Sequence, residues 1–406
     1  MKKYLIVNTG SVSAKYSIYS ELAELFYAYF ETDGGKPAVD FYDSGRKGNM
    51  RTEKITGKDF DDSLECFLDE AEKKGIIANR DEISSVGVRV VAPGTYFQED
   101  RIIDSFFMDH IVKEKDEAPL HVKRTLAEIA ELRNILPKTP IVGISDSAFH
   151  KNAPDFARLY AIPKDVSDKF EIYHYGYHGI SVGSIVEKLA KSGARFANVV
   201  ICHLGGGSSI TAVKNGKSFD TSMGYTPLEG LITSTRAGNI DPVAVFHLAR
   251  KLKKNAAETE EYLNTECGLL GLSKKSGDMR DVIEAAKAGD AAAKLAFQKF
   301  VMAAKKYVGG FAAEMGGIDA LVFSGAIGER AAAVRAEICD GLKYMGVTVD
   351  RPANDAAIAV AADIAAADAR VKVLVIPTDE MESMAERLRA FRVLKHVPME
   401  KKKPGK

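Results

Sequence analysis

The chain has 406 residues, which is enough for two or three domains of ordinary size. Lys and Arg together number 56, and Asp and Glu together also number 56, so the formal net charge at pH 7 is zero. This balance disfavours a protein that binds nucleic acid through bulk positive charge, and we expect no nucleic-acid partner.

Residues 4–19 predict a β-hairpin, because an apolar run is followed by a small polar turn and a returning segment of alternating character. Helical periodicity follows at 59–74 and 122–136, and short apolar strands are predicted at 86–91 and 141–144. The last of these strands delivers Ser145-Asp146-Ser147 at its carboxyl end, where α/β folds present functional side chains.

A second β segment is predicted at 199–204, followed by a glycine-rich loop at 205–207, a strand at 210–213 and a hairpin turn at Asn215-Gly216. Nucleotide fingerprints of the Walker and Rossmann types need a helix after the glycines, and here a strand follows. The order strand, polar residue, small turn and returning strand is shared by residues 5–11 and 200–206. The chain is therefore predicted to be internally duplicated.

Further along, a third glycine turn at 325–328 follows a predicted strand and precedes a helix predicted from Arg330 onward. Ala-rich packing helices are predicted at 291–315 and 353–369. A last strand at 371–376 leads into Pro377-Thr378-Asp379-Glu380 and a helix at 381–394.

The four cysteines are far apart in the sequence, which favours neither a zinc site nor a disulfide framework and fits a reducing compartment. No stretch approaches the roughly 18 to 20 apolar residues of a membrane span. The apolar run at residues 4–7 is too short for the core of a signal peptide. We expect a cytoplasmic protein with no membrane partner.

Small-residue turns after strands can direct several backbone N–H groups at one anion. Three such turns in one chain suggest a cleft between two related domains that holds phosphate oxygens from both sides. Arg89, His178 and Arg236 stand beside small residues and are candidates to reach into it, although a surface ion pair is the commoner role of a single arginine. Asp146 and Glu380 provide carboxylates at strand ends, which Mg²⁺ uses together with substrate phosphates.

These residues, and others in the same order, resemble the acetate kinase family and its short-chain acyl kinase relatives, within the superfamily of sugar kinases, actin and heat-shock ATPases. The resemblance runs nearly end to end. It rests on Asn8-x-Gly10-Ser11-x-Ser13-x-Lys15, on Arg89-Val90-Val91 and on segments 118–121, 146–150, 175–179, 203–209, 226–231, 235–238, 276–280, 324–329 and 377–380.

The resemblance implies an α/β fold of two actin-like (ribonuclease H-like) domains with a central cleft, each with a five-stranded sheet flanked by helices. The first domain would comprise residues 1–147 plus 380–406, with the C-terminal helix returning to it. The second would comprise residues 148–379 and carry the nucleotide site. The implied assembly is a homodimer.

The implied activity is reversible Mg²⁺-dependent transfer of the γ-phosphoryl group of ATP to acetate, giving acetyl phosphate and ADP, with Mn²⁺ as the alternative metal. The resemblance assigns catalysis to Arg89, Asp146, His178 and Arg236, and the metal to Asn8 and Glu380. It assigns the acyl pocket to Arg89, Val91, Leu120, Tyr177 and Pro227. It assigns the nucleotide and its phosphates to Ser11, Ser13, Lys15, His203, Leu204, Gly205, Gly206, Gly207, Asp278, Met279, Arg280, Gly325, Ala326, Ile327, Gly328 and Arg330.

The sequence departs from the family pattern both at residues expected near the acyl group and at residues expected near the phosphoryl donor. At the acyl end Ala92-Pro93-Gly94 replaces His-Gly-Gly, Tyr177 replaces Phe and Val122-Lys123 replaces Asn-Pro, so propionate or another short-chain acid stays an alternative to acetate. Near the phosphoryl donor, four residues differ from the family pattern: Gly206, Asn239, Ala326 and Arg330. Pyrophosphate therefore stays an alternative donor. A catalytically silent nucleotide-binding member is a third alternative, which the retained acceptor-side arginines disfavour.

Overall fold

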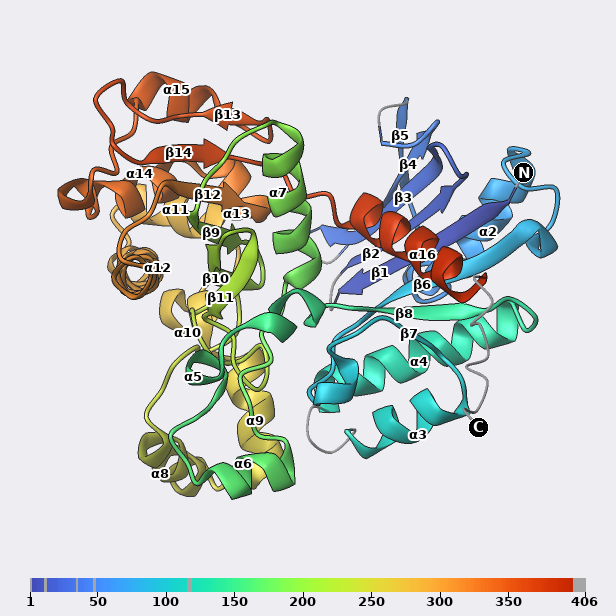
Figure 1. Cartoon of the computed structure of the whole chain (residues 1–406), viewed down its shortest axis with the longest axis horizontal. Helices are drawn as coiled ribbons and strands as arrows, with labels where there is room; N and C mark the ends of the chain where they lie inside the picture. The colour runs from blue at the N-terminus through green and yellow to red at the C-terminus, as the bar shows by residue number, and fades with distance from the viewer. Residues whose placement is uncertain (1, 11–12, 34–35, 47–48, 115–118, 397–406) are drawn as a thin grey trace, which may run out of the picture. The chain divides into compact units, whose positions relative to one another are not determined.

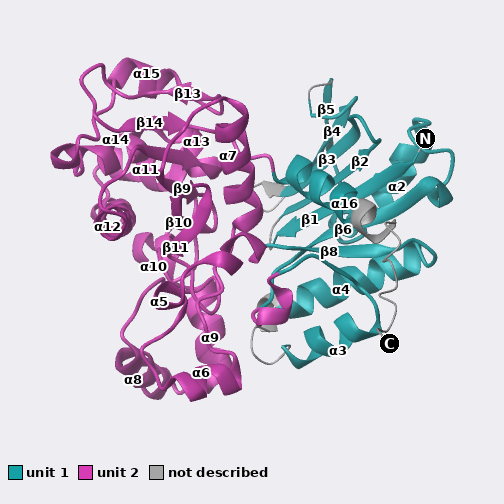
Figure 2. Ribbon diagram, viewed as in Figure 1, with its two compact units in different colours: residues 1–92, 99–146, 380–406 teal, residues 93–98, 147–379 magenta. Residues whose placement is uncertain are grey.

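The structure is a computed structural model that describes residues 2–10, 13–33, 36–46, 49–114 and 119–396 (Figure 1). The chain divides into two compact units, coloured separately in Figure 2. Unit 1 comprises residues 1–92, 99–146 and 380–406, and unit 2 comprises residues 93–98 and 147–379. The predicted division differs from these units at Ser147 and at residues 93–98, which lie in unit 2.

In the described part of unit 1, eight strands form one sheet in the order β5-β4-β3-β2-β1-β6-β8-β7. Neighbours from β5 to β1 are antiparallel, β1, β6 and β8 are parallel, and β7 is antiparallel to β8. The strands are β1 (Lys3–Gly10), β2 (Ser13–Tyr19), β3 (Glu24–Asp33), β4 (Lys36–Asp43), β5 (Met50–Lys54), β6 (Ile83–Val90), β7 (Arg101–Ile102) and β8 (Ile141–Ser145).

In the described part of unit 2, six strands form a sheet in the order β11-β10-β9-β12-β14-β13. The strands β9, β12 and β14 are parallel, and the remaining pairings are antiparallel. The strands are β9 (Asn198–Leu204), β10 (Ser208–Lys214), β11 (Lys217–Thr221), β12 (Ala320–Ser324), β13 (Ala362–Asp363) and β14 (Lys372–Val375).

The two sheets share one plan, as the repeated hairpin predicted. In each sheet a three-stranded antiparallel meander is followed by two parallel strands and a two-residue antiparallel edge strand. The prediction of five strands per sheet is wrong, because it omits these edge strands and the extension β4-β5 in unit 1.

Helices cover both faces of the sheet of unit 1. In Figure 1 the red helix α16 (Glu380–His396) crosses the blue strands, and it contacts β1, β6 and β8. The absence of a side chain at Gly87 lets Leu388 of α16 approach the sheet beside Ile6. On the opposite face the ring of Phe67 stacks on Tyr16 and Phe26. The other helices of unit 1 lie on this second face of the sheet or in the loops beside it. They are α1 (Gly57–Asp61), α2 (Ser63–Lys73), α3 (Ser105–Lys113) and α4 (Pro119–Ile135).

The sheet of unit 2 lies between α12 (Ala291–Met315) and α7 (Gly179–Lys191). Alternation along β9 separates the two cores: Val200, Cys202 and Leu204 pack with α12, whereas Val199 and Ile201 pack with α7. The helix α12 begins where the side chain of Asp290 accepts a hydrogen bond from the N–H of Ala293, and it ends at Gly316, whose φ is +79°. Its predicted bounds are confirmed.

The remaining helices of unit 2 are shorter. Two differ from the predictions: α13 begins at Gly325, so the third glycine turn is itself helical, and the predicted helix at 353–369 is wrong. There α15 ends at Ala356, and the chain turns to place β13 against β14 and to bury Ile364. The bounds are α5 (Asp155–Arg158), α6 (Lys164–Phe170), α8 (Pro242–Leu252), α9 (Ala256–Thr265), α10 (Gly268–Ser273), α11 (Met279–Lys287), α13 (Gly325–Arg330), α14 (Ala332–Asp340) and α15 (Arg351–Ala356).

Candidate active site

The carboxyl ends of β1, β6 and β8 bring three predicted residues to one edge of the sheet of unit 1. Asn8 lies near the end of β1, Arg89 near the end of β6, and Asp146 directly after β8. Arg89 Nη2 donates to Asp146 Oδ2 at 2.9 Å, and Arg89 Nη1 lies 3.5 Å from Asn8 Oδ1. Asn8 Nδ2 donates to Oε2 of Glu380, the first residue of α16, at 2.8 Å. These four residues form one connected group, which we call the Arg89 cluster.

The Arg89 cluster holds its charges in a poorly hydrated place. The side chain of Asp146 is 1% exposed and that of Arg89 is 18% exposed. Burial lowers the pKa of the Arg89 guanidinium, but the carboxylates of Asp146 and Glu380 outweigh it, so the net pKa is raised. Arg89 therefore stays charged, and its short bond to Asp146 fixes its orientation.

The oxygen atoms of the Arg89 cluster suit a hard divalent cation. The Glu380 carboxylate and the Asn8 amide oxygen are ligands of the type that Mg²⁺ takes. Within the described residues no group of three or more His, Cys, Asp and Glu side chains is arranged to hold a metal by itself. Mg²⁺ in phosphoryl-transfer sites commonly uses one or two protein carboxylates together with substrate phosphates, so this sparse donor set fits it.

A polar group that the sequence patterns did not single out lies on the opposite face of the same sheet edge. Thr9 Oγ1 donates to Glu128 Oε2 at 2.9 Å, and Arg124 Nε donates to Thr9 Oγ1 at 3.2 Å. The Oε1 atom of Glu128 is buried and has no hydrogen-bond partner among the described residues. Burial raises the pKa of Glu128 to about 7, against the lowering effect of the Thr9 hydrogen bond.

In unit 2, two histidine rings are neighbours: His178 directly precedes α7, and His203 lies in β9. His178 Nδ1 and Ser209 Oγ are 2.9 Å apart, His203 Nδ1 and Ser181 Oγ are 2.7 Å apart, and the two imidazole rings lie 4.3 Å apart. His178 immediately precedes α7 with a φ of +60°, which a residue other than glycine rarely adopts. The two serines orient these rings and were not among the predicted site residues.

Arg236 meets His178 at Gly207. A Cβ added to Gly207 would lie 3.2 Å from His178 Nε2 and 3.4 Å from Arg236 Nη1, so both side chains approach the backbone of this loop. Two hydrogen bonds hold the loop that carries Arg236. Within the loop, the N–H of Arg236 donates to Thr233 Oγ1 at 3.1 Å. The N–H of Ser234 donates to the carbonyl of Gly206 in the glycine-rich loop at 3.2 Å. Unit 2 therefore brings two of the predicted catalytic residues and the glycine-rich loop together.

The predicted nucleoside segment packs directly against this loop. Gly325 has a φ of +74°, and a Cβ there would lie 2.6 Å from the Leu204 carbonyl oxygen, which leaves no room for a side chain. Glu329 Oε1 accepts hydrogen bonds from the N–H groups of Gly325 and Thr378 at 3.0 and 3.1 Å. The side chains of Ala326 and Arg330 are exposed on α13, whereas Ile327 packs against the core.

The predicted acyl-pocket residues are distributed over both units. Tyr177 is 1% exposed and its hydroxyl donates to the Tyr225 carbonyl at 2.7 Å. Pro227 is buried close by in the sequence, and Val91 follows β6 in unit 1. The side chain of Leu120 lies outside the described residues.

Several predicted nucleotide residues have local roles in the structure. Asp278 caps α11 and pairs with exposed Arg280 at 2.7 Å, which lowers the pKa of the Asp278 carboxyl. Met279 is 3% exposed and packs in the core, so its side chain is not available to a nucleotide. Lys15 Nζ lies 5.7 Å from the centre of the Tyr29 ring, and Ser13 begins β2. Ser11 lies outside the described residues.

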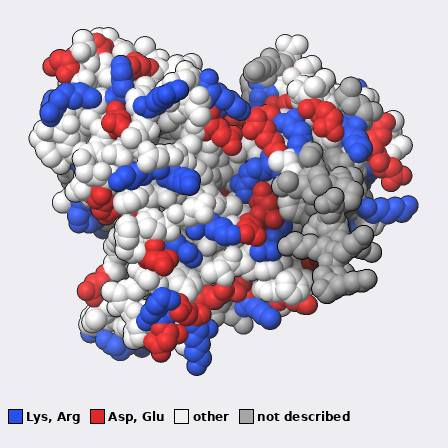
Figure 3. Space-filling model, viewed as in Figure 1, with Lys and Arg blue, Asp and Glu red and all other residues white. Residues whose placement is uncertain are grey.

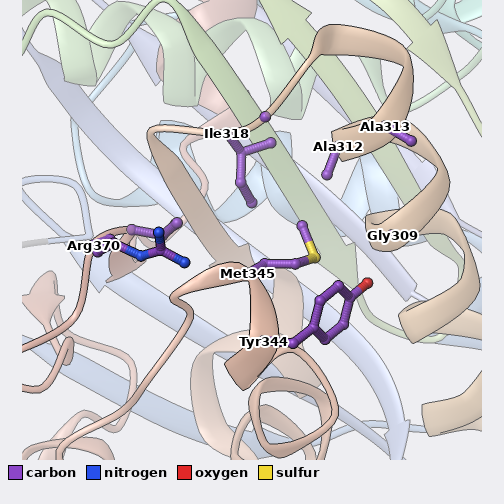
Figure 4. Close-up of a pocket in the computed structure, with 9 residues that line it drawn as sticks. Gly309, Ala312, Ala313, Ile318, Tyr344, Met345 and Arg370 are labelled. Carbon is purple, nitrogen blue, oxygen red and sulfur yellow. The ribbon is translucent and has the colours of Figure 1, made fainter.

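Cavities in the described part of unit 2 are lined by residues other than the predicted site residues. One, of about 520 Å³, lies between the end of α12 and residues 344–345 and 370–371 (Figure 4). Another, of about 450 Å³, is lined by residues of β11, α12 and the segment 229–239. On the face shown in Figure 3, basic and acidic side chains are interspersed. Within the described residues no helix is both long and apolar enough to cross a membrane.

Comparison with known proteins gives the family. The family model described as the acetokinase family matches residues 3–386. The chain is 38% identical over 393 residues to the acetate kinase of Clostridium acetobutylicum, covering 93% of this chain and 96% of that protein. It is 37% identical over 401 residues to the acetate kinase of Acetivibrio thermocellus, covering 96% and 99%.

Solved structures give the same result. The crystal structure of Porphyromonas gingivalis acetate kinase matches with a TM-score of 0.82 at 31% identity, covering 97% of this chain and 100% of that chain. A propionate kinase from Francisella tularensis subsp. tularensis matches with a TM-score of 0.83 at 34% identity, covering 95% and 99%. These likenesses confirm the predicted fold class of actin-like α/β domains. The chain belongs to the acetokinase family.

Proposed function

We propose that this protein is an acetate kinase, which transfers the γ-phosphoryl group of ATP to acetate reversibly and depends on Mg²⁺. Its family membership identifies it as a kinase that acts on a carboxylate. The observation that carries the assignment to this chain is the Arg89 cluster. A protein that only bound nucleotide would have no use for a guanidinium that a buried carboxylate holds at this sheet edge.

The acceptor carboxylate needs no general base, because it is already ionised at neutral pH. The obstacle is the approach of an anion to the polyanionic phosphate chain, which cationic donors reduce. Arg89, oriented by Asp146, would bind the carboxylate with its two-pronged guanidinium.

The residues of unit 2 would bind the migrating phosphoryl group. Either atom of the contact between Ser209 Oγ and His178 Nδ1 could be the donor; with the hydroxyl as donor, a neutral imidazole would carry its proton on Nε2, the atom beside Gly207. That N–H and the guanidinium of Arg236 would donate to the equatorial oxygens of the phosphoryl group. The backbone N–H groups of the 205–207 loop and His203 would bind the β- and γ-phosphates.

Asn8 and Glu380 would hold Mg²⁺ together with the nucleotide phosphates, either directly or through water. When bound, the cation neutralises charge that develops on the phosphate oxygens. Mn²⁺ shares this preference for oxygen ligands and would occupy the same donor set.

The test is formation of an acyl phosphate by the purified protein. With ATP, Mg²⁺ and acetate in the presence of hydroxylamine, we expect acetohydroxamate and an equal amount of ADP. Omission of acetate or Mg²⁺, or the Arg89→Ala variant, should abolish the hydroxamate. No hydroxamate with acetate, propionate or butyrate would overturn the proposal.

Propionate is the second candidate acceptor, because a relative named a propionate kinase matches the fold as well as the acetate kinase does. One additional methylene changes binding by only ~1 to 3 kcal/mol, so the two acids can share one pocket. Measuring kcat/KM for each acid with ATP and with pyrophosphate separates acetate from propionate and also decides the donor.

We also propose a homodimer and a cytoplasmic location, in line with the predictions from the sequence. Light scattering coupled to size-exclusion chromatography should give about twice the chain mass of 44.1 kDa. A mass of one chain at micromolar concentration would exclude a stable dimer.

A further inference from the structure

Arg335 on α14 is a fully buried guanidinium, with 0% of the residue exposed. Its Nε donates to Asn354 Oδ1 at 2.9 Å, and its Nη1 donates to the Gly328 carbonyl at 2.9 Å. Its Nη2 donates to the carbonyls of Asn354 and Ala357 at 2.6 and 2.9 Å. All four acceptors are carbonyl oxygens, so the guanidinium is hydrogen-bonded to carbonyl dipoles and to no carboxylate in these contacts.

These carbonyls belong to two separate elements. Gly328 lies in α13, and Asn354 and Ala357 lie in and just after α15. Asn354 Nδ2 donates in turn to the Ala332 carbonyl at 3.0 Å, and the N–H of Ala359 donates to the Glu329 carbonyl at 3.0 Å. The polar contacts of Arg335 therefore tie α13, α14 and the end of α15 into one rigid group.

Stability alone is a poor explanation for such a residue. A buried charge is costly to desolvate, and an apolar side chain of similar volume often stabilises a core as well or better. What a guanidinium adds is geometry, because its planar fork fixes the direction of several carbonyls at once. One of these carbonyls lies in α13, the segment that packs against Leu204 at the end of β9 and exposes Ala326 and Arg330.

We propose that Arg335 is a positioning residue for the nucleoside of the phosphoryl donor. It acts through the Gly328 carbonyl, which sets where α13 presents its backbone and the side chains of Ala326 and Arg330 to a purine nucleoside. The phosphates of the donor would instead contact the 205–207 loop, which Arg335 does not touch. This inference rests on the proposed use of ATP.

The test compares a ligand with a nucleoside and one without. Arg335→Lys keeps the charge but removes the fork, and we expect the Kd of ADP, measured calorimetrically, to rise at least tenfold. The Kd of inorganic tripolyphosphate should change less than twofold. In turnover, KM for ATP should rise at least tenfold, while KM for acetate and kcat at saturating ATP stay within about threefold. The control is Arg351→Lys, an exposed arginine of α15 that pairs with Asp340, and it should leave every value unchanged.

Asn354→Ala provides a second test if Arg335→Lys does not fold. It removes one acceptor of the guanidinium and should shift ADP binding in the same direction by a smaller factor. A folded variant with unchanged ADP affinity, or with equal losses for ADP and tripolyphosphate, would overturn the inference. Because ligand binding is measured without turnover, this result is independent of whether the wild-type protein forms acetyl phosphate.

Discussion

Three candidate site side chains, two catalytic and one phosphate-binding, are each oriented by a second side chain from another element. Asp146 after β8 holds Arg89 of β6, Ser209 of β10 holds His178, and Ser181 of α7 holds His203. Sequence patterns identify cations and histidines beside glycines, but they do not show which hydroxyl a later strand will place against a ring. For this reason sequence patterns could single out the histidines as candidates, whereas they could not single out the two serines that orient them.

Arg236 gives the most direct test at the scale of one residue. Its guanidinium lies against Gly207 beside His178, so Arg236→Ala removes a cation without emptying the hydrophobic core. We expect kcat to fall roughly 10³-fold, the range in which one transition-state donor contributes. Thermal unfolding should be unchanged. Arg250→Ala on α8, at an exposed position, should leave kcat unaffected, and an unchanged rate in Arg236→Ala would remove this residue from the mechanism.

Glu128 predicts a pH dependence of stability. Because burial raises its folded pKa to about 7 from an ordinary 4.5, the folded protein holds a proton that the unfolded chain releases. The contribution of Glu128 to the free energy of unfolding is fully present below pH ~4.5, and it is lost as pH rises to about 7. The difference amounts to ~3 kcal/mol.

The charge-free variant Glu128→Gln isolates this contribution, since all other carboxyl groups titrate in both proteins. From urea unfolding at pH 5 and pH 8, the variant should gain stability relative to the wild type as pH rises. Parallel stability curves for the two proteins would show that Glu128 is ionised in the folded state at both pH values.

At the scale of elements, the periodicity of apolar residues predicted helices and strands better than alanine content did. The two hairpins, α12, and the strands leading to Asp146 and to Gly325 follow from apolar patterns. The strand β3 was missed although Phe26, Ala28 and Phe30 alternate with more exposed residues. The Ala-rich segment after α15 was predicted as helix because Ala favours helices, but that preference is small beside strand pairing and the burial of Ile364.

The loop that carries Arg236 depends on a close approach at Gly268, the first residue of α10. Its φ is +63°, and a Cβ there would lie 2.3 Å from the Thr233 carbonyl oxygen and 2.9 Å from the backbone N of Arg236. Gly268→Ala should therefore displace the loop. We expect kcat to fall roughly 10- to 100-fold, because catalysis is sensitive to ångström displacements.

Gly289→Ala is the matched control, because Gly289 also has a positive φ, +91°, but open space around its Cβ position. Both variants carry a backbone cost of ~1 to 2 kcal/mol. Gly268→Ala should lose an additional ~1 to 3 kcal/mol from the steric conflict, measured by denaturant unfolding. Equal stability and equal kcat in the two variants would contradict this account.

At the scale of the whole molecule, the duplicated plan includes an exchange of helices. The helix α7 follows β8 of unit 1 in the chain but packs on the sheet of unit 2. The helix α16 follows β14 of unit 2 but packs on β1, β6 and β8 of unit 1. Each unit therefore completes its core with a helix that comes after the last parallel strand of the other. Of these two helices, the sequence patterns predicted α16 but not α7, and local periodicity cannot show which sheet a helix covers.

This arrangement predicts that removing the C-terminal residues destabilises unit 1 more than unit 2. A protein that ends at Asp379 keeps every described element of unit 2 but lacks Met381, Met384, Ala385 and Leu388, which bury the face of β1, β6 and β8. Burial of each large side chain contributes ~1.5 to 3 kcal/mol, so the combined loss approaches the ~5 to 15 kcal/mol stability of a whole domain. The truncated protein also loses the pairing of Arg387 with Asp100 and the Glu380 carboxylate.

Hydrogen exchange followed by mass spectrometry should therefore show rapid exchange throughout β1, β6 and β8, with β9, β12 and β14 still protected. In the full chain, Leu388→Ala should reproduce the effect in part, with a loss of ~2 to 5 kcal/mol confined to unit 1. Because the Arg89 cluster lies at the edge of the sheet that loses its cover, acyl kinase activity should disappear from the truncated protein. If β1, β6 and β8 kept full protection without residues 380–406, the core of unit 1 would not depend on α16.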